Sequence, residues 1–328
     1  MTVLVTGAAG FIGYHVSAAL LARGERVVGV DNLNPYYSVA LKRARLKRLQ
    51  AHRNFAFHRL DLAVAGRIEG VAKRARGIDR VVHLAAQAGV RYSLDHPRAY
   101  AASNLMAQLE VMEACRALKG LKHFVYASSS SVYGANSKLP FSEDDRVEMP
   151  QSLYAATKRA DELMAYCYAH LYRIPTTGLR FFTVYGPWGR PDMAAWLFVE
   201  AIERGKPIKL FNDGRMRRDF TYVDDIVQGV LAALDRPPSD GGPGAPPHRI
   251  YNLGNNRAED LGNFVAALET ALGRTAKRQN LPMQKGDVPA TYADIAAARR
   301  DLGFAPRTSI DVGLRRFVDW YRDYHKRR

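Results

Sequence analysis

Tyr154 and Lys158 are the two residues whose types and spacing could most readily move a proton. Side chains four positions apart lie one above the other on the same face of a helix. A phenol has a pKa of about 10 and is a poor base at neutral pH, but a fixed ammonium beside it favours the phenolate. Such a pair can take the proton of a hydroxyl while a hydride leaves the same carbon. Because Tyr and Lys are also common on helix surfaces, the pair needs a cofactor site nearby to indicate catalysis.

The first 31 residues supply the pattern of such a site. A short apolar run predicts a buried strand, three glycines follow at Gly7, Gly10 and Gly13, and a helix is predicted over 14–23. This order is typical of a turn that holds a pyrophosphate against a helix N-terminus. A second predicted strand ends at Asp31, about 20 residues beyond the turn, where a carboxylate binds a ribose 2′-hydroxyl and repels a 2′-phosphate. The pattern therefore favours NAD over NADP. Because the strand, the helix and the acid all stand at the expected distances from the glycines, a glycine turn without a ligand is the weaker interpretation.

The elements that would position these residues alternate along the chain. Strands are predicted near 3–6, 26–31, 55–60, 79–85, 122–129 and 175–181, and helices near 11–23, 38–51, 66–75, 97–119 and 153–172. This alternation indicates an α/β fold with a doubly wound parallel sheet covered by helices on both faces. After residue 185 the segments become shorter and mixed, with a helix at 224–234 and a strand at 249–253, which indicates a second, smaller part.

Several longer motifs resemble a known family. The glycine spacing is similar to that of extended short-chain dehydrogenase/reductases. Residues 31–37, 180–193, 216–225 and 286–294 resemble NAD-dependent nucleotide-sugar epimerases, and most closely the UDP-glucuronate 4-epimerases. The resemblance implies a Rossmann domain at 1–185 plus 224–257 that binds NAD, and a mixed α/β domain at 186–223 plus 258–328 that binds a UDP-hexuronic acid. It also implies a homodimer formed through the helices at 97–119 and 153–172.

The resemblance implies roles for individual residues. Ser129 would complete a catalytic triad with Tyr154 and Lys158. The cofactor would be bound by Gly7, Gly10, Phe11, Ile12, Gly13, Asp31, Asn32, Asp61, Leu62, Leu84, Ala85, Ala86, Gln87, Asn104, Tyr154 and Lys158. The substrate would be bound by Arg91, Ser129, Ser130, Ser131, Tyr154, Thr183, Arg190, Met193, Arg218, Gln284 and Asp287. Among these, the arginines would hold anionic groups of the substrate. We expect the hydroxyls of Ser130, Ser131 and Thr183 to hold the sugar carboxylate. Gln284 and Asp287 correspond to contacts with the uridine and its ribose.

Positions 130 and 131 separate the reactions that this family carries out. Related 4,6-dehydratases carry Asp-Glu there, and UDP-glucuronate decarboxylases usually keep a Glu at the second position, whereas this chain has Ser130 and Ser131. We therefore expect reversible 4-epimerisation of UDP-glucuronate to UDP-galacturonate through a transient 4-keto sugar, with the hydride held on bound NAD. A UDP-glucose/UDP-galactose 4-epimerase, a UDP-glucuronate decarboxylase and a non-catalytic NAD-binding protein remain alternatives.

Composition sets wider bounds on the 328-residue chain. Its formal net charge is +16, and the basic runs at 42–48 and 325–328 are interpreted as solvated helix faces, not as a nucleic-acid site. No apolar run approaches the ~18 residues of a membrane span, and Met1 leads directly into the first predicted strand. We expect a cytoplasmic enzyme without membrane, nucleic-acid or metal partners. His83 is interpreted as structural, and Cys115 and Cys167 as reduced and buried.

Overall fold

The computed structural model describes residues 1–75 and 77–326. Its main feature is a sheet in which, over that part of the chain, seven strands follow the order β11-β6-β5-β4-β1-β2-β3, and each neighbouring pair is parallel. The strands are β1 (Thr2–Thr6), β2 (Arg26–Asp31), β3 (Phe55–Arg59), β4 (Ile78–His83), β5 (His123–Ser129), β6 (Thr176–Phe181) and β11 (His248–Leu253). Residues such as Val3, Val5 and Val82 are wholly buried, as expected for strands covered on both faces.

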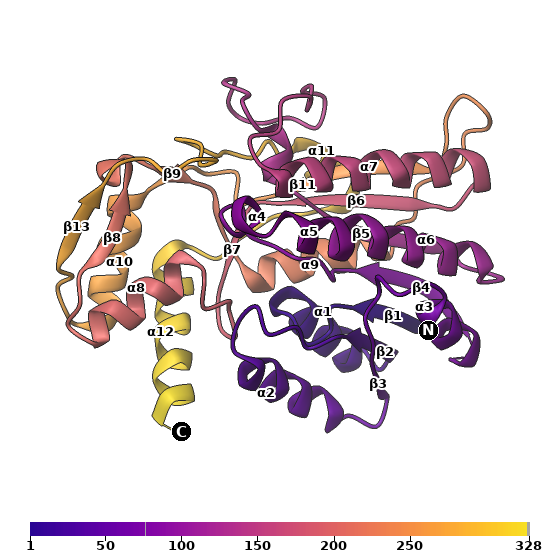
Figure 1. The fold of residues 1–328 in the computed structure, drawn as a ribbon, viewed down its shortest axis with the longest axis horizontal. Coiled ribbons are helices and arrows are strands. Elements are labelled where there is room, and N and C mark those ends of the chain that lie inside the picture. The colour runs from indigo at the N-terminus through magenta and orange to yellow at the C-terminus, as the bar shows by residue number, and fades with distance from the viewer. Residues whose placement is uncertain (76, 327–328) are drawn as a thin grey trace.

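Helices cover both faces of this sheet (Figure 1). One layer contains α1 (Phe11–Ala22), which packs against α2 (Val39–Gln50) and α9 (Val223–Leu234). The other contains α6 (Ala107–Ala117), which packs between α3 (Arg67–Arg74) and α7 (Leu153–Tyr172). The predicted doubly wound α/β fold is confirmed.

A smaller lobe lies at the left of Figure 1. Its helices are α8 (Ala194–Glu203), α10 (Leu261–Leu272) and α12 (Ile310–Lys326), beside the parallel pair β8 (Ile208–Phe211) and β13 (Arg278–Leu281). Two further strand pairs, β7 (Thr183–Tyr185) with β10 (Phe220–Tyr222) and β9 (Arg217–Arg218) with β12 (Glu259–Asp260), lie near the junction with the sheet. The short η3 (Asn212–Gly214) follows β8, and α11 (Ala296–Leu302) packs on α9 and β11. The exact domain boundaries stay a prediction.

The helix predicted over 97–119 runs without a break over 97–117 but changes its type. It consists of α5 (Pro97–Tyr100), a π-helical segment η1 (Ala101–Met106) and α6, with α4 (Tyr92–Asp95) just before them. The hydrophobic pattern cannot reveal this change, because a π-helical turn adds one residue without ending the helix. A 3₁₀ turn, η2 (Ser130–Tyr133), likewise follows β5.

Two predictions about surface and core are wrong in part. Within the basic run at 42–48, Arg43 and Lys47 are exposed, but Lys42 and Arg45 are buried, because their head groups bond backbone carbonyls of Asn34, Ala9, Trp188 and Gly189. Residues 327–328 of the terminal basic run lie outside the described residues. Cys115 is buried as predicted, but Cys167 is exposed, because it lies on the outer side of α7.

None of the helices within the described ranges is both long enough and apolar enough to span a membrane.

Candidate active site

A cavity of about 1140 Å³ lies where the carboxyl ends of the parallel strands face the smaller lobe. Ligand pockets usually enclose ~300–1,000 Å³, so this cavity is large enough for more than one small ligand. Its walls come from the glycine turn after β1, the ends of β2, β4 and β5, the start of α7, and β7, β8 and β9. In an α/β sheet this edge is the usual place for a ligand.

The glycine turn leaves no room for side chains. Gly7 has φ +69°, and a Cβ there would lie 2.8 Å from the backbone nitrogen of Ala85. A Cβ on Gly13 would lie 2.0 Å from the Gly7 carbonyl oxygen. The turn thus brings bare backbone to the N-terminus of α1 and to the cavity, which is the geometry that a pyrophosphate requires.

Asp31 closes this end of the cavity. Its carboxylate accepts hydrogen bonds from the backbone N–H of Ala9, at 3.1 Å, and of Leu33, at 2.8 Å. These bonds tie the acid to the glycine turn while it lines the cavity together with Asn32 and Asp61. Asn32 Nδ2 donates to Asp61 Oδ2 at 3.2 Å. The residues at this end therefore fit a dinucleotide with an unmodified adenosine ribose.

Tyr154 and Lys158 lie on the first turns of α7, on the side that faces the cavity. The helix begins after Ser152, whose hydroxyl accepts the N–H of Ala155 at 3.1 Å. Tyr154 is therefore close to the helix N-terminus, where the backbone dipole favours negative charge.

Lys158 is buried and held in place from behind. Its Nζ donates to the carboxylate of Asp161 at 2.9 Å and to the carbonyl of Ala127 at 3.0 Å. Burial alone would lower the pKa of Lys158, but the charges of Asp161 and Tyr154 outweigh it and raise that pKa. The lysine therefore stays an ammonium, the form that stabilises a phenolate.

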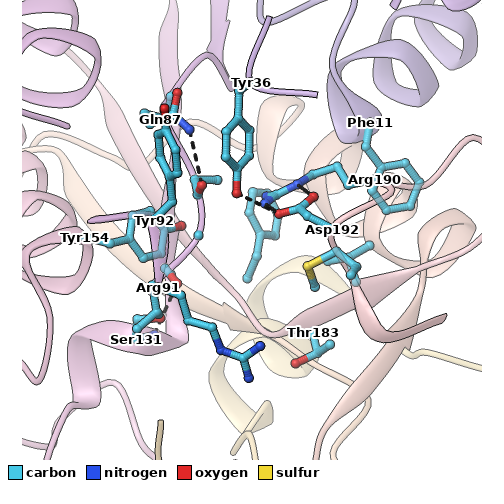
Figure 2. Close-up of a pocket in the computed structure, with 18 of the residues that line it drawn as sticks. Phe11, Tyr36, Gln87, Arg91, Tyr92, Ser131, Tyr154, Thr183, Arg190 and Asp192 are labelled. Carbon is cyan, nitrogen blue, oxygen red and sulfur yellow. Dashed lines mark hydrogen bonds and ion pairs between the residues drawn. The ribbon is translucent and has the colours of Figure 1, made fainter. Parts of the chain in front are cut away.

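Hydroxyl groups line the cavity on two sides. Ser129, Ser130 and Ser131 follow one another at the end of β5, and Ser129 Oγ accepts the N–H of Ser131 at 3.2 Å. Thr183, the first residue of β7, lies on the opposite side of the pocket from Ser131 (Figure 2). These side chains donate hydrogen bonds without adding charge.

Arg190 faces the cavity within a local ion pair. Its Nε donates to Asp192 Oδ1 at 3.0 Å, its Nη2 donates to Asp192 Oδ2 at 2.5 Å, and the hydroxyl of Tyr36 donates to the same Oδ2 at 3.0 Å. Figure 2 shows this group on one side of the pocket and Tyr154 with Ser131 on the other. Burial, with the nearby Asp192 charge, raises the pKa of Tyr36 to about 12, so its hydroxyl remains a donor.

A second set of charges lies at the mouth of the cavity. Arg91 pairs with Asp287 at 3.0 Å, and its guanidinium packs over the ring of Phe211. Arg218 donates to the carbonyls of Arg217 and Pro289, at 2.9 and 3.2 Å. Burial, with the positive charge of Arg91 adding to it, lowers the pKa of Arg218.

The structure places nearly all the predicted site residues in the lining of this cavity; Asn104 and Gln284 are the predicted residues that do not line it. Asn104 lies in η1 and is buried; it bonds both the backbone N–H and the carbonyl of Gln87, and it donates to Thr157 at 2.9 Å. It therefore connects the end of β4 to α7 from behind the cavity.

Tyr36, Asp161 and Asp192 are among the site residues that were not predicted from the sequence. Only the last two could have been suspected, because an acid stands three residues after Lys158 and two after Arg190.

Comparisons with known proteins agree with this geometry. Residues 3–254 match the family model described as the NAD dependent epimerase/dehydratase family. A probable UDP-glucuronate 4-epimerase of Rhizobium meliloti (strain 1021) is 46% identical over 338 residues, covering 100% of this chain and 98% of that protein. The UDP-glucuronic acid 4-epimerase of Bacillus cereus, solved with UDP-glucuronic acid and NAD, superposes with a TM-score of 0.90 at 35% identity and covers 99% of this chain and 100% of its own.

A UDP-glucose 4-epimerase of Thermotoga maritima, solved with UDP-glucose, is similar at a lower level. Its TM-score is 0.88 at 30% identity, with 99% of this chain and 100% of that chain covered. With its cofactor turn, its cavity and these relatives, the chain belongs to the NAD dependent epimerase/dehydratase family.

Proposed function

We propose that this protein is a UDP-glucuronate 4-epimerase that works with tightly bound NAD. The observation that carries the proposal is that Ser129, Ser130, Ser131, Tyr154 and Thr183 line one cavity together with the glycine turn. Of the named relatives, the Rhizobium meliloti protein is a probable UDP-glucuronate 4-epimerase and the Bacillus cereus enzyme was solved with UDP-glucuronic acid and NAD, whereas the less similar Thermotoga maritima enzyme was solved with UDP-glucose. The hydroxyls at 130 and 131 supply no acid or base for dehydration, which favours epimerisation within the family.

The cofactor would lie along the cavity floor. The backbone of the glycine turn would hold its diphosphate and Asp31 its adenosine ribose. Leu84, Ala85, Ala86 and Gln87, at the end of β4, line the cavity at Gly7, where Ala85 leaves no room for a side chain. When bound, NAD supplies a reversible hydride acceptor.

Proton transfer would fall to the residues of α7 and β5. Tyr154 would take the proton of the sugar 4-hydroxyl as hydride leaves C4. After the 4-keto sugar has turned over, hydride would return to the opposite face of C4, and Tyr154 would return a proton to the 4-keto oxygen. Lys158 would stabilise the phenolate form by its charge, and Ser129 would hydrogen-bond the reacting oxygen. The Asp161 and Ala127 contacts leave one of the three N–H donors of Lys158 for the cavity side.

The substrate would be held at both of its anionic ends. Arg190 and Arg218 would bind the diphosphate, with Arg91 and Asp287 at the mouth on the uridine side. Ser130, Ser131 and Thr183 would hold the sugar carboxylate. Because a 4-keto hexuronate is a β-keto acid, that carboxylate must be kept out of the orientation in which its bond to the ring can break.

Replacing Thr183 tests the carboxylate contact. Thr183→Val keeps the shape of the side chain and removes the donor. We expect a rise in UDP-pentose among the products, or a rise of roughly tenfold in KM for UDP-glucuronate, as one lost hydrogen bond to a charged group predicts. Products are separated by anion-exchange chromatography, and an unchanged product ratio together with an unchanged KM would contradict this contact.

We also propose that the protein is a homodimer that uses the outer face of α7. Leu163, Tyr166 and Leu171 on α7 are 52%, 47% and 64% exposed, and Met106 on the adjoining η1 is 47% exposed. Such a cluster of apolar side chains on neighbouring helices is typical of an interface. Sedimentation should give a dimer for the wild type and a monomer for Leu163→Arg; a wild-type monomer at micromolar concentration would contradict it.

The substrate choice is tested by comparing UDP-glucuronate with UDP-glucose. The hydroxyl cluster predicts that kcat/KM is at least about a hundredfold higher for the acid sugar, since two or more donors face its carboxylate. Equal or reversed values would identify a UDP-glucose/UDP-galactose 4-epimerase instead. Release of carbon dioxide with UDP-pentose as the main product would identify a decarboxylase.

A further inference from the structure

The loop at 186–190, which carries Arg190 into the cavity, is held through three successive carbonyl groups. His15 Nε2 lies 2.8 Å from the Pro187 oxygen and, because a carbonyl only accepts, must carry the proton. Arg45 donates to the oxygens of Trp188 and Gly189. Both donors belong to the NAD-side helices α1 and α2, which lie far from this loop in the sequence.

Arg45 is the central donor of this arrangement. Its side chain is fully buried, at 0% exposure, and lies within a helix whose Arg43, Lys47 and Arg48 are exposed to solvent. Nε and Nη2 donate to Trp188 O at 3.1 and 2.6 Å, Nη2 to Gly189 O at 3.0 Å, and Nη1 to Ala9 O and Tyr37 Oη at 3.0 and 2.7 Å. These bonds use all five N–H groups of the guanidinium, and every acceptor is neutral.

The bonds of Arg45 compensate for an unfavourable backbone. Trp188 has φ +60°, in the left-handed region that a residue with a bulky side chain rarely adopts. Its carbonyl receives two of the Arg45 bonds, and its ring packs against Tyr14 and under the guanidinium of Arg48. The ring also packs against Trp320 and Tyr324 of α12, so side chains of α1, α2 and α12 together hold the loop, while its backbone carbonyls are bonded from α1 and α2.

Arg45 also contacts the cofactor turn. Ala9, whose carbonyl it binds, lies between Gly7 and Gly10, and the N–H of the same residue donates to Asp31. One buried cation thus touches the turn on which the diphosphate of NAD would lie and the loop from which Arg190 reaches the cavity. Its charge also adds positive potential beneath that turn.

We propose that Arg45 is a positioning residue for nucleotide-sugar binding, which fixes the loop of Arg190 against the glycine turn so that the Arg190 guanidinium meets the substrate diphosphate. This inference rests on the proposed function for the identity of the substrate. Arg45 is 0% exposed and does not line the cavity, so it acts through Arg190 and not by touching the ligand.

The test compares Arg45→Gln with Arg43→Gln, an exposed neighbour on the same helix. UDP affinity is measured by calorimetry on the full chain in saturating NAD, with kcat, KM and Tm measured alongside. We expect Arg45→Gln to raise Kd for UDP and KM about tenfold, the effect of one misplaced charge-assisted bond. Arg43→Gln should match the wild type. Unchanged UDP affinity in Arg45→Gln would overturn the proposal.

A double-mutant cycle separates positioning from general destabilisation. If Arg45 acts through Arg190, Arg45→Gln should cause no further loss of UDP affinity in an Arg190→Gln background. Additive losses in the double variant would overturn the proposal. Should Arg45→Gln fail to fold, Arg45→Lys replaces it: it keeps the charge but not the planar fork, and the same weakening is expected.

The role of Arg45 can be tested independently of whether the protein is a UDP-glucuronate 4-epimerase. If the wild type binds UDP without converting UDP-glucuronate, the proposed reaction is wrong, while a selective loss of UDP affinity in Arg45→Gln still supports this inference. A wild type that binds no UDP would contradict both.

Discussion

At the scale of single residues, the chemistry depends on how Lys158 is kept charged. The side chain is 2% exposed, and an isolated ammonium at such a site would lose its proton readily. The carboxylate of Asp161, 2.9 Å away, provides the opposing charge and is itself buried. Asp161 would thus support the proposed proton transfer without lining the cavity.

This pairing predicts a change in pH dependence. The pKa of Lys158 is raised by Asp161 against the opposing effect of burial, so Asp161→Asn should lower it. A step that needs the ammonium is lost as pH rises through that pKa, so the alkaline limb of kcat should move to lower pH. Asp319→Asn, an exposed acid on α12, is the control. An alkaline limb at the wild-type pH in Asp161→Asn would show that the pair does not set the charge.

Tyr154→Phe removes the proposed base and leaves the ring in place. General acid–base groups contribute about 10²–10⁴ in rate, so kcat should fall by at least a hundredfold while UDP affinity stays near the wild-type value. Initial rates measure the fall in kcat, and calorimetry measures the UDP affinity. A variant with more than about a tenth of wild-type kcat would assign the proton transfer to another group.

At the scale of elements, the strands and main helices follow from the sequence, because each has a clear hydrophobic run between glycines or prolines. Tyr154 and Lys158 could be singled out from their types and helical spacing, whereas the role of Ser129, the last residue of β5, was implied only by the family resemblance. The burial of Arg45 could not, because its partners Trp188 and Gly189 are 143 and 144 residues away. A local run of basic residues predicts a solvated helix face, but contacts with residues distant in the sequence bury Arg45.

The contact between β5 and α9 predicts a loss of stability in acid. His123 is buried between Leu234 O, at 3.1 Å, and Thr177 Oγ1, at 2.9 Å. Burial is the main reason that its pKa is lowered from 6.5 to about 4. Because the unfolded chain takes up the proton first, the stabilisation is complete above pH ~6.5 and is lost as pH falls towards 4, by about 2 kcal/mol at pH 5.

Urea unfolding at pH 7.5 and pH 5 checks this directly. His123→Gln keeps a donor and an acceptor but does not titrate, so its free energy of unfolding should fall by about 2 kcal/mol less than that of the wild type between the two values. An equal fall in both proteins would show that His123 is not the group responsible.

At the scale of the whole molecule, the formal charge of +16 should affect the rate of encounter with an anionic substrate. Lys42, Arg91, Arg190, Lys209 and Arg218 line the cavity, but five aspartates line it too. Attraction of the substrate would therefore come from the net charge of the whole chain more than from the lining. Raising the salt from 20 to 200 mM should lower kcat/KM for UDP-glucuronate several-fold, through roughly a threefold shorter screening length, and leave kcat nearly unchanged. Stopped-flow association rates measure the effect, and a salt-independent kcat/KM would show that the charge does not steer the substrate.

The proposed epimerase activity is tested most simply by incubating the purified protein with UDP-glucuronate, without added cofactor, and following the sugar signals by proton NMR. We predict that UDP-galacturonate grows to a plateau, because NAD stays bound and is regenerated in every turnover. Activity that persists in full after NAD has been removed, or a spectrum that does not change, would contradict the central claim.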